Sequence, residues 1–136
     1  MNYYFDKTIN HDFEESIEKV TDVLKQEGFG ILARIDMHKT LKEKINVDFR
    51  KYTILEACNP PFAYRSLQAE ENIGIMLPCN IVIQEVGENE VKVSMVNPVV
   101  AMQNVKNPEM DNIASEIKQK LEKAINNLVS IQAESF

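Results

Sequence analysis

The stretch NPEMDNIASEIKQKLEKAINNL, residues 107–128, decides the fold class. Asn107 is a typical helix N-cap, and Pro108 suits the first helical turn. Apolar side chains then recur every three or four residues, at Met110, Ile113, Ile117, Leu121, Ala124 and Leu128. This spacing puts them on one face of a helix, which we expect to run to about Ser130 and to cover much of a sheet.

Strand patterns upstream of this helix supply the sheet. Apolar residues alternate or cluster as they do in strands over residues 2–8, 29–35, 52–57, 80–85 and 91–95. The last two of these segments flank a short turn and form a hairpin pattern. The chain should therefore hold at least five strands.

Further helices are expected between the strands. Asp12 and Glu15 form a capping box that opens a helix ended by Gly28. Asn59 and Pro60 open a second helix over 60–70. Residues 38–44 are expected to form a short helix with Leu41 and Ile45 buried, whereas residues 96–107 are expected to form the longest loop.

The resulting order, β-α-β-(α)-β-α-β-β-α, predicts an α+β fold with helices packed on one face of a mainly antiparallel sheet. A chain of 136 residues is long enough to build one full core. We therefore expect a single domain over residues 1–136.

The composition limits the classes of binding partner and the cellular compartment that we expect for this protein. The net charge of −6 argues against nucleic acid, and Glu43 and Asp48 interrupt the cationic cluster over residues 39–51. The first residues lack the pattern of a signal peptide, and no apolar run approaches the ~20 residues of a membrane span. We expect a cytoplasmic protein in which thiols are reduced, so a permanent disulfide is disfavoured.

The two cysteines are the main candidate site. Cys58 follows one predicted strand, and Cys79 precedes the next one along the chain. Antiparallel pairing of these strands would bring both residues to the same end of the sheet, whereas parallel pairing would separate them. Cys58 also precedes a helix N-terminus, where free amides favour thiolate, so it is expected to be the more reactive of the two.

Several chemistries remain open at this place. Two thiolates are too few for a closed zinc site, so a soft metal such as zinc or copper would need His38, with Asp36 or Asp48, as further ligands. The amides of Asn59 and Asn80 could bind a small polar ligand beside the thiols. The sequence has no Ser-His-Asp order and no glycine-rich phosphate loop, and Cys58 with His38 is its candidate nucleophile–base pair.

The motifs around the cysteines resemble those of domain-of-unknown-function family 302. The resemblance rests on residues 58–64 (CNPPFAY) and 73–80 (IGIMLPCN), on 28–32, 35–36 and 41–44, and on Asn97-Pro98. It implies a compact α+β fold of the TATA-binding-protein-like class, with a curved antiparallel sheet and often a homodimer, and without DNA binding. It also implies that Asp36, Asn59, Pro60 and Pro78 are a shared framework and that the cysteines mark a subtype.

Three functional hypotheses follow. The first is a non-enzymatic module that binds a small ligand or soft metal at the Cys58/Cys79 edge. The second is a thiol redox protein or thiol enzyme in which Cys58 is the nucleophile and Cys79 the resolving thiol. The third is a structural homodimer module with buried thiols.

Overall fold

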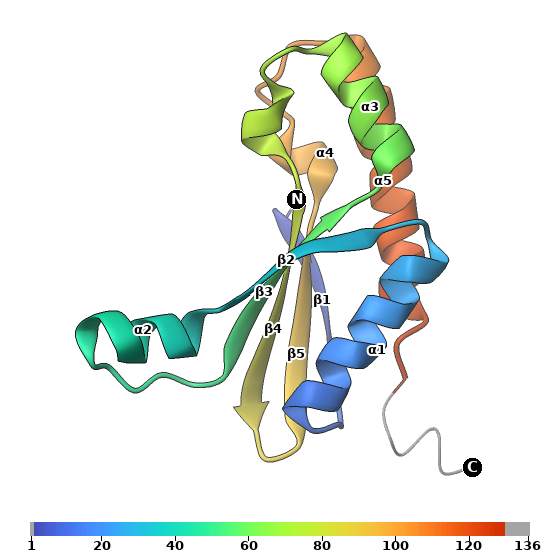
Figure 1. The fold of residues 1–136 in the computed structure, drawn as a ribbon. Coiled ribbons are helices and arrows are strands. Elements are labelled where there is room, and N and C mark those ends of the chain that lie inside the picture. Colours follow the sequence, from blue (N-terminus) through green and yellow to red (C-terminus); the bar gives the residue numbers. More distant parts are fainter. Residues whose placement is uncertain (1, 130–136) are drawn as a thin grey trace.

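A five-stranded antiparallel sheet forms the centre of the protein, described here by a computed structural model that covers residues 2–129 (Figure 1). The strand order across the sheet is β1-β5-β4-β3-β2, with every neighbouring pair antiparallel. The strands are β1 (Tyr4–Ile9), β2 (Gly30–Asp36), β3 (Tyr52–Cys58), β4 (Cys79–Gly87) and β5 (Glu90–Val96).

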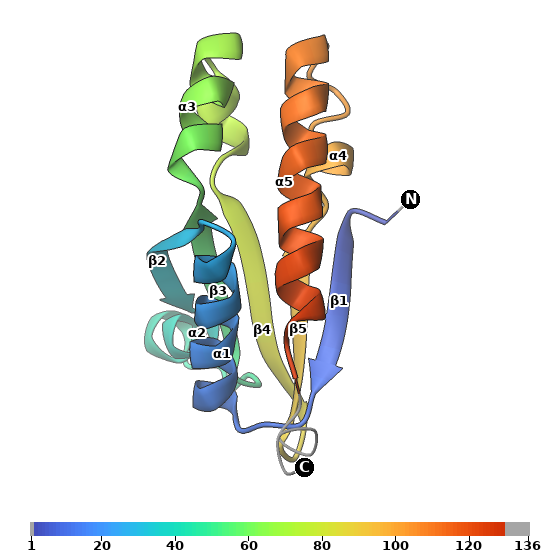
Figure 2. The ribbon, with the colours of Figure 1, turned by 90° about the vertical axis from the view of Figure 1, so that its right-hand side faces the viewer.

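Helices α1 (Phe13–Gln26), α3 (Pro60–Ala69) and α5 (Pro108–Asn126) lie on one side of this sheet. Figure 2 looks onto that side, with α1 and α5 in front of the strands. The chain also forms helix α2 (Met37–Ile45), the short helix α4 (Pro98–Ala101) and the 3-10 turn η1 (Ile73–Met76). The α+β class and the antiparallel sheet predicted from the sequence are confirmed.

The core lies between the sheet and these helices. Alternate residues of the strands face it, so that Leu55, Ile81, Ile83, Val93 and Met95 are almost completely buried. The apolar stripe of α5 packs onto them, as its spacing predicts, and Met110, Ile113 and Leu121 have no exposed surface. Burial of this apolar area is the main favourable term in folding.

The helix starts follow the caps read from the sequence. Asp12 accepts a hydrogen bond from the Glu15 backbone amide at 2.8 Å and so caps α1. Asn107 accepts one from the Glu109 amide at 3.0 Å and caps α5. The structure ends α5 at Asn126, and the predicted end at Ser130 lies outside the described residues.

Residues 96–107 are not the plain loop that we expected, because they contain α4. Asn97 accepts a hydrogen bond from the Val99 amide at 3.2 Å, and Pro98 occupies the first turn. This is the same Asn-Pro pair that opens α3 and α5. The pair therefore starts a helix at all three places in the chain, and at residues 97–98 it also follows the end of β5 at Val96.

The expectation that α2 buries Leu41 and Ile45 is wrong. No residue of α2 is buried, and Ile45 is 64% exposed. Figures 1 and 2 agree that α2 projects from the edge of the sheet on the side away from α1 and α5. Its apolar positions consequently have no layer of their own chain to face.

A glycine and an asparagine join the end of α1 to the start of α3. Gly28 adopts a left-handed φ of 88°, and the Nδ2 of Asn59 donates to the Glu27 carbonyl at 3.1 Å. A Cβ at residue 28 would lie 3.1 Å from that same nitrogen. The position therefore needs glycine both for its backbone angle and for the space beside Asn59.

We predict that Gly28→Ala lowers the free energy of unfolding by about 1–2 kcal/mol. A left-handed φ is unfavourable for alanine, and the added Cβ would crowd the side chain of Asn59. Gly30→Ala is the matched control, since a Cβ at Gly30 has no atom within 4 Å. Urea unfolding of the two variants and the parent measures the effect. Equal losses for both variants would contradict the role assigned to Gly28.

Candidate functional site

The two cysteines lie at the same end of the sheet, because β3 and β4 pair antiparallel. Cys79 is directly opposite Ala57, the residue before Cys58. Cys58 in turn pairs with Gly30 at the start of β2. The antiparallel pairing on which the predicted site depended is thus present, and both thiols lie in one region of the protein.

The register also separates the two side chains. Residues directly opposite one another share a face of the sheet, so Cys79 lies on the helix-covered face with Ala57. Cys58 is the next residue along β3 and projects from the other face. Both cysteines are free thiols, and side chains that point apart cannot form a disulfide without movement of the backbone.

Both cysteines nevertheless line one cavity at this end of the sheet, with a volume of ≈ 210 Å³. Its other walls come from β2 and the residue before it, from α3, from α5, and from η1 and the segment that leads from it into β4. These walls are mostly apolar, and they include Phe29, Phe62, Leu67, Gly74, Leu77 and Ile117. The cavity is therefore a hydrophobic hollow with two sulfur atoms in its wall.

The Cys79 thiol is held in its protonated form. Burial, and to a smaller extent the neighbouring Cys58, raises the pKa of Cys79 to about 11. A thiol with such a pKa carries little thiolate at neutral pH and is a weak nucleophile. Cys79 therefore acts in the cavity wall as a small, polarizable apolar group.

The two asparagines of the sequence hypothesis have separate environments. Asn59 is at the N-cap position of α3, but its side chain makes no capping bond and instead holds the Glu27 carbonyl. It lines the cavity while serving this structural contact. Asn80 follows Cys79 in β4 and faces the other side of the sheet, where it lines a different hollow of ≈ 400 Å³.

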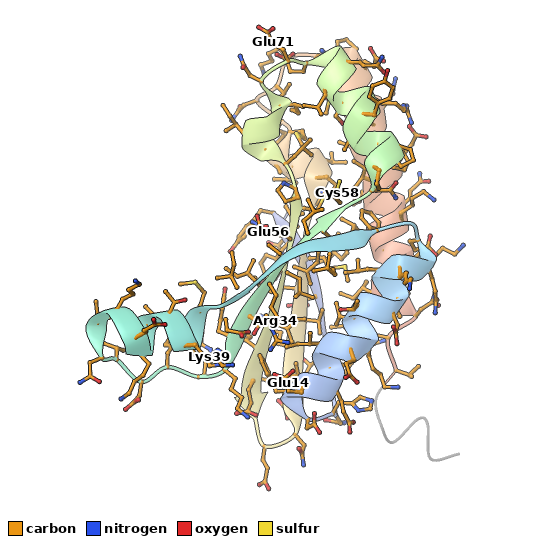
Figure 3. All side chains as sticks on the ribbon, viewed as in Figure 1. Glu14, Arg34, Lys39, Glu56, Cys58 and Glu71 are labelled. Carbon is orange, nitrogen blue, oxygen red and sulfur yellow. The ribbon has the colours of Figure 1, made fainter. Side chains whose placement is uncertain are left out.

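Asp36 and His38 lie far from the cysteines. Cys58 pairs with one end of β2, at Gly30, and Thr53 pairs with the other end, at Asp36, so about 20 Å of strand separates the two places. Figure 3 shows the same separation, with Cys58 at the start of α3 and Lys39 out on α2. The structure therefore does not bring Asp36 or His38 to the thiols.

Each of these two residues has a local structural role. Asp36 accepts hydrogen bonds from Thr53 Oγ1 at 2.7 Å and from Arg34 Nε at 3.0 Å. Burial alone would raise the pKa of Asp36, but these two donors outweigh it and lower the pKa. His38 Nδ1 accepts the Tyr52 backbone amide at 3.0 Å, so this nitrogen is occupied.

The arginine beside Asp36 ties the edge of the sheet to α1. Arg34 binds the Glu14 carboxylate with both terminal nitrogens, at 2.8 and 3.3 Å, and the two side chains point toward each other in Figure 3. The hydrogen bond from Arg34 lowers the pKa of Glu14. This network joins α1, β2 and the base of α2.

No group of three or more His, Cys, Asp or Glu side chains within residues 2–129 is arranged to hold a metal ion. The same part of the chain contains no helix that is long and apolar enough to cross a membrane. A soft metal at the thiols would thus find two sulfur atoms and would need other ligands.

Sequence reasoning missed most of the cavity wall. Gly74 and Leu77 belong to the apolar run just before Cys79, and that run was the available signal for them. Ile117 is one of several equivalent positions in the stripe of α5, and Phe29 is one of several apolar strand residues. Their part in the cavity depends on packing between elements, which the local pattern does not encode.

Comparisons with known proteins agree with this architecture. A search of curated proteins found no match. The crystal structure of an uncharacterized conserved protein DUF302 from Bacillus stearothermophilus is similar, with a TM-score of 0.85 and 30% sequence identity over 93% of this chain and 98% of that chain. The family described as Domain of unknown function DUF302 matches residues 5–128. With nearly its whole length matched, the chain belongs to the DUF302 family.

Proposed function

We propose that this protein is a small-molecule binding domain without a reaction of its own, and that its site is the cavity at the end of β3 and the start of β4. The observation that carries the proposal is the cavity itself, a hollow of ≈ 210 Å³ between α3, α5 and the sheet with Cys58 and Cys79 in its wall. Concave, mostly apolar hollows with a few polar groups are the usual form of ligand sites.

The wall indicates the class of ligand. Drug-sized molecules occupy sites of roughly 300–1,000 Å³, so this cavity suits a smaller molecule. Its apolar lining favours a compact apolar or aromatic ligand, and the two sulfur atoms favour polarizable groups on that ligand. In the reducing cytoplasm expected from the sequence, both sulfur atoms would remain thiols.

The other hypotheses have less support. A zinc or copper site would need Cys79 to lose its proton against a pKa of about 11 and would need ligands beyond the two sulfur atoms. A redox pair would need the two thiols to meet, although the strand register points them to opposite faces. Binding of a small neutral ligand requires neither deprotonation of Cys79 nor contact between the two thiols.

A large side chain in the cavity wall should weaken binding. Gly74 is an exposed residue of the cavity lining, and a Cβ there has no atom within 4 Å, so Gly74→Phe adds a ring at this part of the wall without a clash at its Cβ. We expect Gly74→Phe to weaken the binding of benzene or indole at least about tenfold, which is ~1.4 kcal/mol. Titration followed by NMR of the protein methyl groups measures both affinities.

Gly74→Ala is the control for that experiment, because it adds one methyl group without filling the cavity. Its affinity for the two probes should stay close to that of the parent. The proposal fails if neither probe binds the parent, or if the phenylalanine variant, folded by circular dichroism, binds as tightly as the alanine variant.

The pH dependence of thiol reactivity tests the environment of Cys79. In Cys58→Ser, Cys79 is the remaining thiol, and burial, the larger of the two causes of its raised pKa, still leaves it with much less thiolate at pH 8 than in the unfolded chain. We predict a correspondingly slower reaction with Ellman's reagent, rising about tenfold per pH unit toward pH 11. Stopped-flow absorbance with and without urea measures both rates.

The raised pKa of Cys79 also makes the stability of the folded protein depend on pH. The folded protein holds the thiol proton more tightly than the unfolded chain, so this contribution is complete below pH 9 and is lost as pH rises toward about 11. If folded Cys58→Ser reacts with Ellman's reagent at pH 8 as fast as the urea-unfolded variant does, the burial of the Cys79 thiol does not raise its pKa as we describe.

A further inference from the structure

The face of the sheet turned away from α1, α3 and α5 holds a hollow of its own (Figure 1). We call this surface the open face. The hollow has a volume of ≈ 400 Å³, nearly twice the ≈ 210 Å³ of the cavity beside Cys79, and small-molecule sites occupy roughly 300–1,000 Å³. Residues of β1, β5, β4 and β3 line it, so it extends across four neighbouring strands. The open-face hollow is therefore large enough for a ligand of several rings.

The floor of the open-face hollow combines uncharged polar groups with apolar ones. Ser94 of β5 lies directly opposite Val82 of β4, and Asn80 and Gln84 are the next residues of β4 on the same face. The Oε1 atom of Gln84 accepts a hydrogen bond from Arg50 at 2.9 Å, which leaves its NH₂ group to donate. One hydroxyl and two amides thus offer donors and acceptors beside apolar carbon.

Tyrosine residues lie at two diagonally opposite corners of this floor. Tyr4 belongs to β1, and Tyr52 belongs to β3, three strands away. Tyr52 pairs with Gln84, and Gln84 pairs with Lys92. Lys92 pairs with Thr8, four residues along β1 from Tyr4. With ~4.8 Å between strands and ~3.4 Å per residue, the Cα atoms of the two tyrosines are about 20 Å apart along the sheet.

The charges around the open-face hollow balance one another. Lys92 is the charged residue of its lining, and the Nζ atom of Lys92 lies 3.3 Å from Asp6 Oδ2. Arg50 lies beside the hollow, 5.9 Å from the centroid of the Tyr52 ring, and Glu56 adds a carboxylate to the same face of β3. Two cations therefore face two carboxylates in a chain of net charge −6, which favours an uncharged ligand over an anion.

We propose that the open-face hollow binds a neutral oligosaccharide. A sugar ring has an apolar C–H face that packs on the negative face of an aromatic ring, and its hydroxyl groups both donate and accept hydrogen bonds. Tyr3 offers the most accessible ring, since it is 70% exposed and its centroid lies 4.8 Å from that of Tyr4. The distance between Tyr4 and Tyr52 favours several linked sugars over a single heteroaromatic base. This site is separate from the cavity beside Cys79 and does not depend on the ligand proposed there.

A matched pair of tyrosine variants tests the site. Tyr3 is 70% exposed and Tyr64 on α3 is 64% exposed, so alanine at either place leaves the core intact. We expect NMR titration of the parent with cellotriose, maltotriose and tri-N-acetylchitotriose to show saturable binding of at least one of them. Tyr3→Ala should raise the dissociation constant of that trisaccharide at least about tenfold through lost stacking, whereas Tyr64→Ala should leave it unchanged.

Backbone amide shifts in the same titration locate the bound sugar. The amides of Gln84 and Ser94 should shift on binding, whereas those of Gly74 and Leu67, in the lining of the cavity beside Cys79, should keep their positions. The proposal is overturned if none of the three trisaccharides binds, if the two tyrosine variants bind equally, or if the shifts gather around Gly74. Binding of adenosine at Gln84 and Ser94, without binding of any trisaccharide, would assign the hollow to a single heteroaromatic ring and would also overturn the proposal.

Discussion

The antiparallel pairing of β3 with β4 determines where every candidate residue of this protein lies. It brings the end of one strand and the start of the next to the same place, which is why Cys58 and Cys79 share a region. The same pairing sets Cys79 opposite Ala57 and not opposite Cys58, so the two thiols belong to different faces. A shift of one residue would exchange those faces and would bury the wrong side of both strands.

The hydrogen bond between Asn59 and the Glu27 carbonyl shows that a candidate binding residue can have a structural role in the fold. Asn59 lines the cavity, but its amide holds the last turn of α1 beside the first turn of α3. Gly28 is needed there because a side chain would press on that amide. The cavity therefore keeps its shape through a polar contact between two helices, and this contact accounts for the asparagine without any ligand.

The sequence predicted those parts of the fold that local patterns determine. The stripe of α5, the Asp12 cap and the strands were within reach because the spacing of apolar residues reports the period of each element. The exposure of α2 could not be predicted in this way. Apolar residues such as Leu41 and Ile45 indicate that one face of a helix can be buried, but they do not identify the element that would bury it. The split of Asn80 from Cys79 and the distance of His38 from both thiols depend on register and strand length, which follow from the packing of the whole sheet.

Cys58 connects the two surfaces of the protein. It belongs to the face of β3 that carries Ile54 and Glu56, and it also lines the cavity together with Cys79 and Ile117. The chemistry of the two thiols should therefore be considered separately, because Cys79 belongs to the helix-covered face of the sheet and Cys58 to the opposite face.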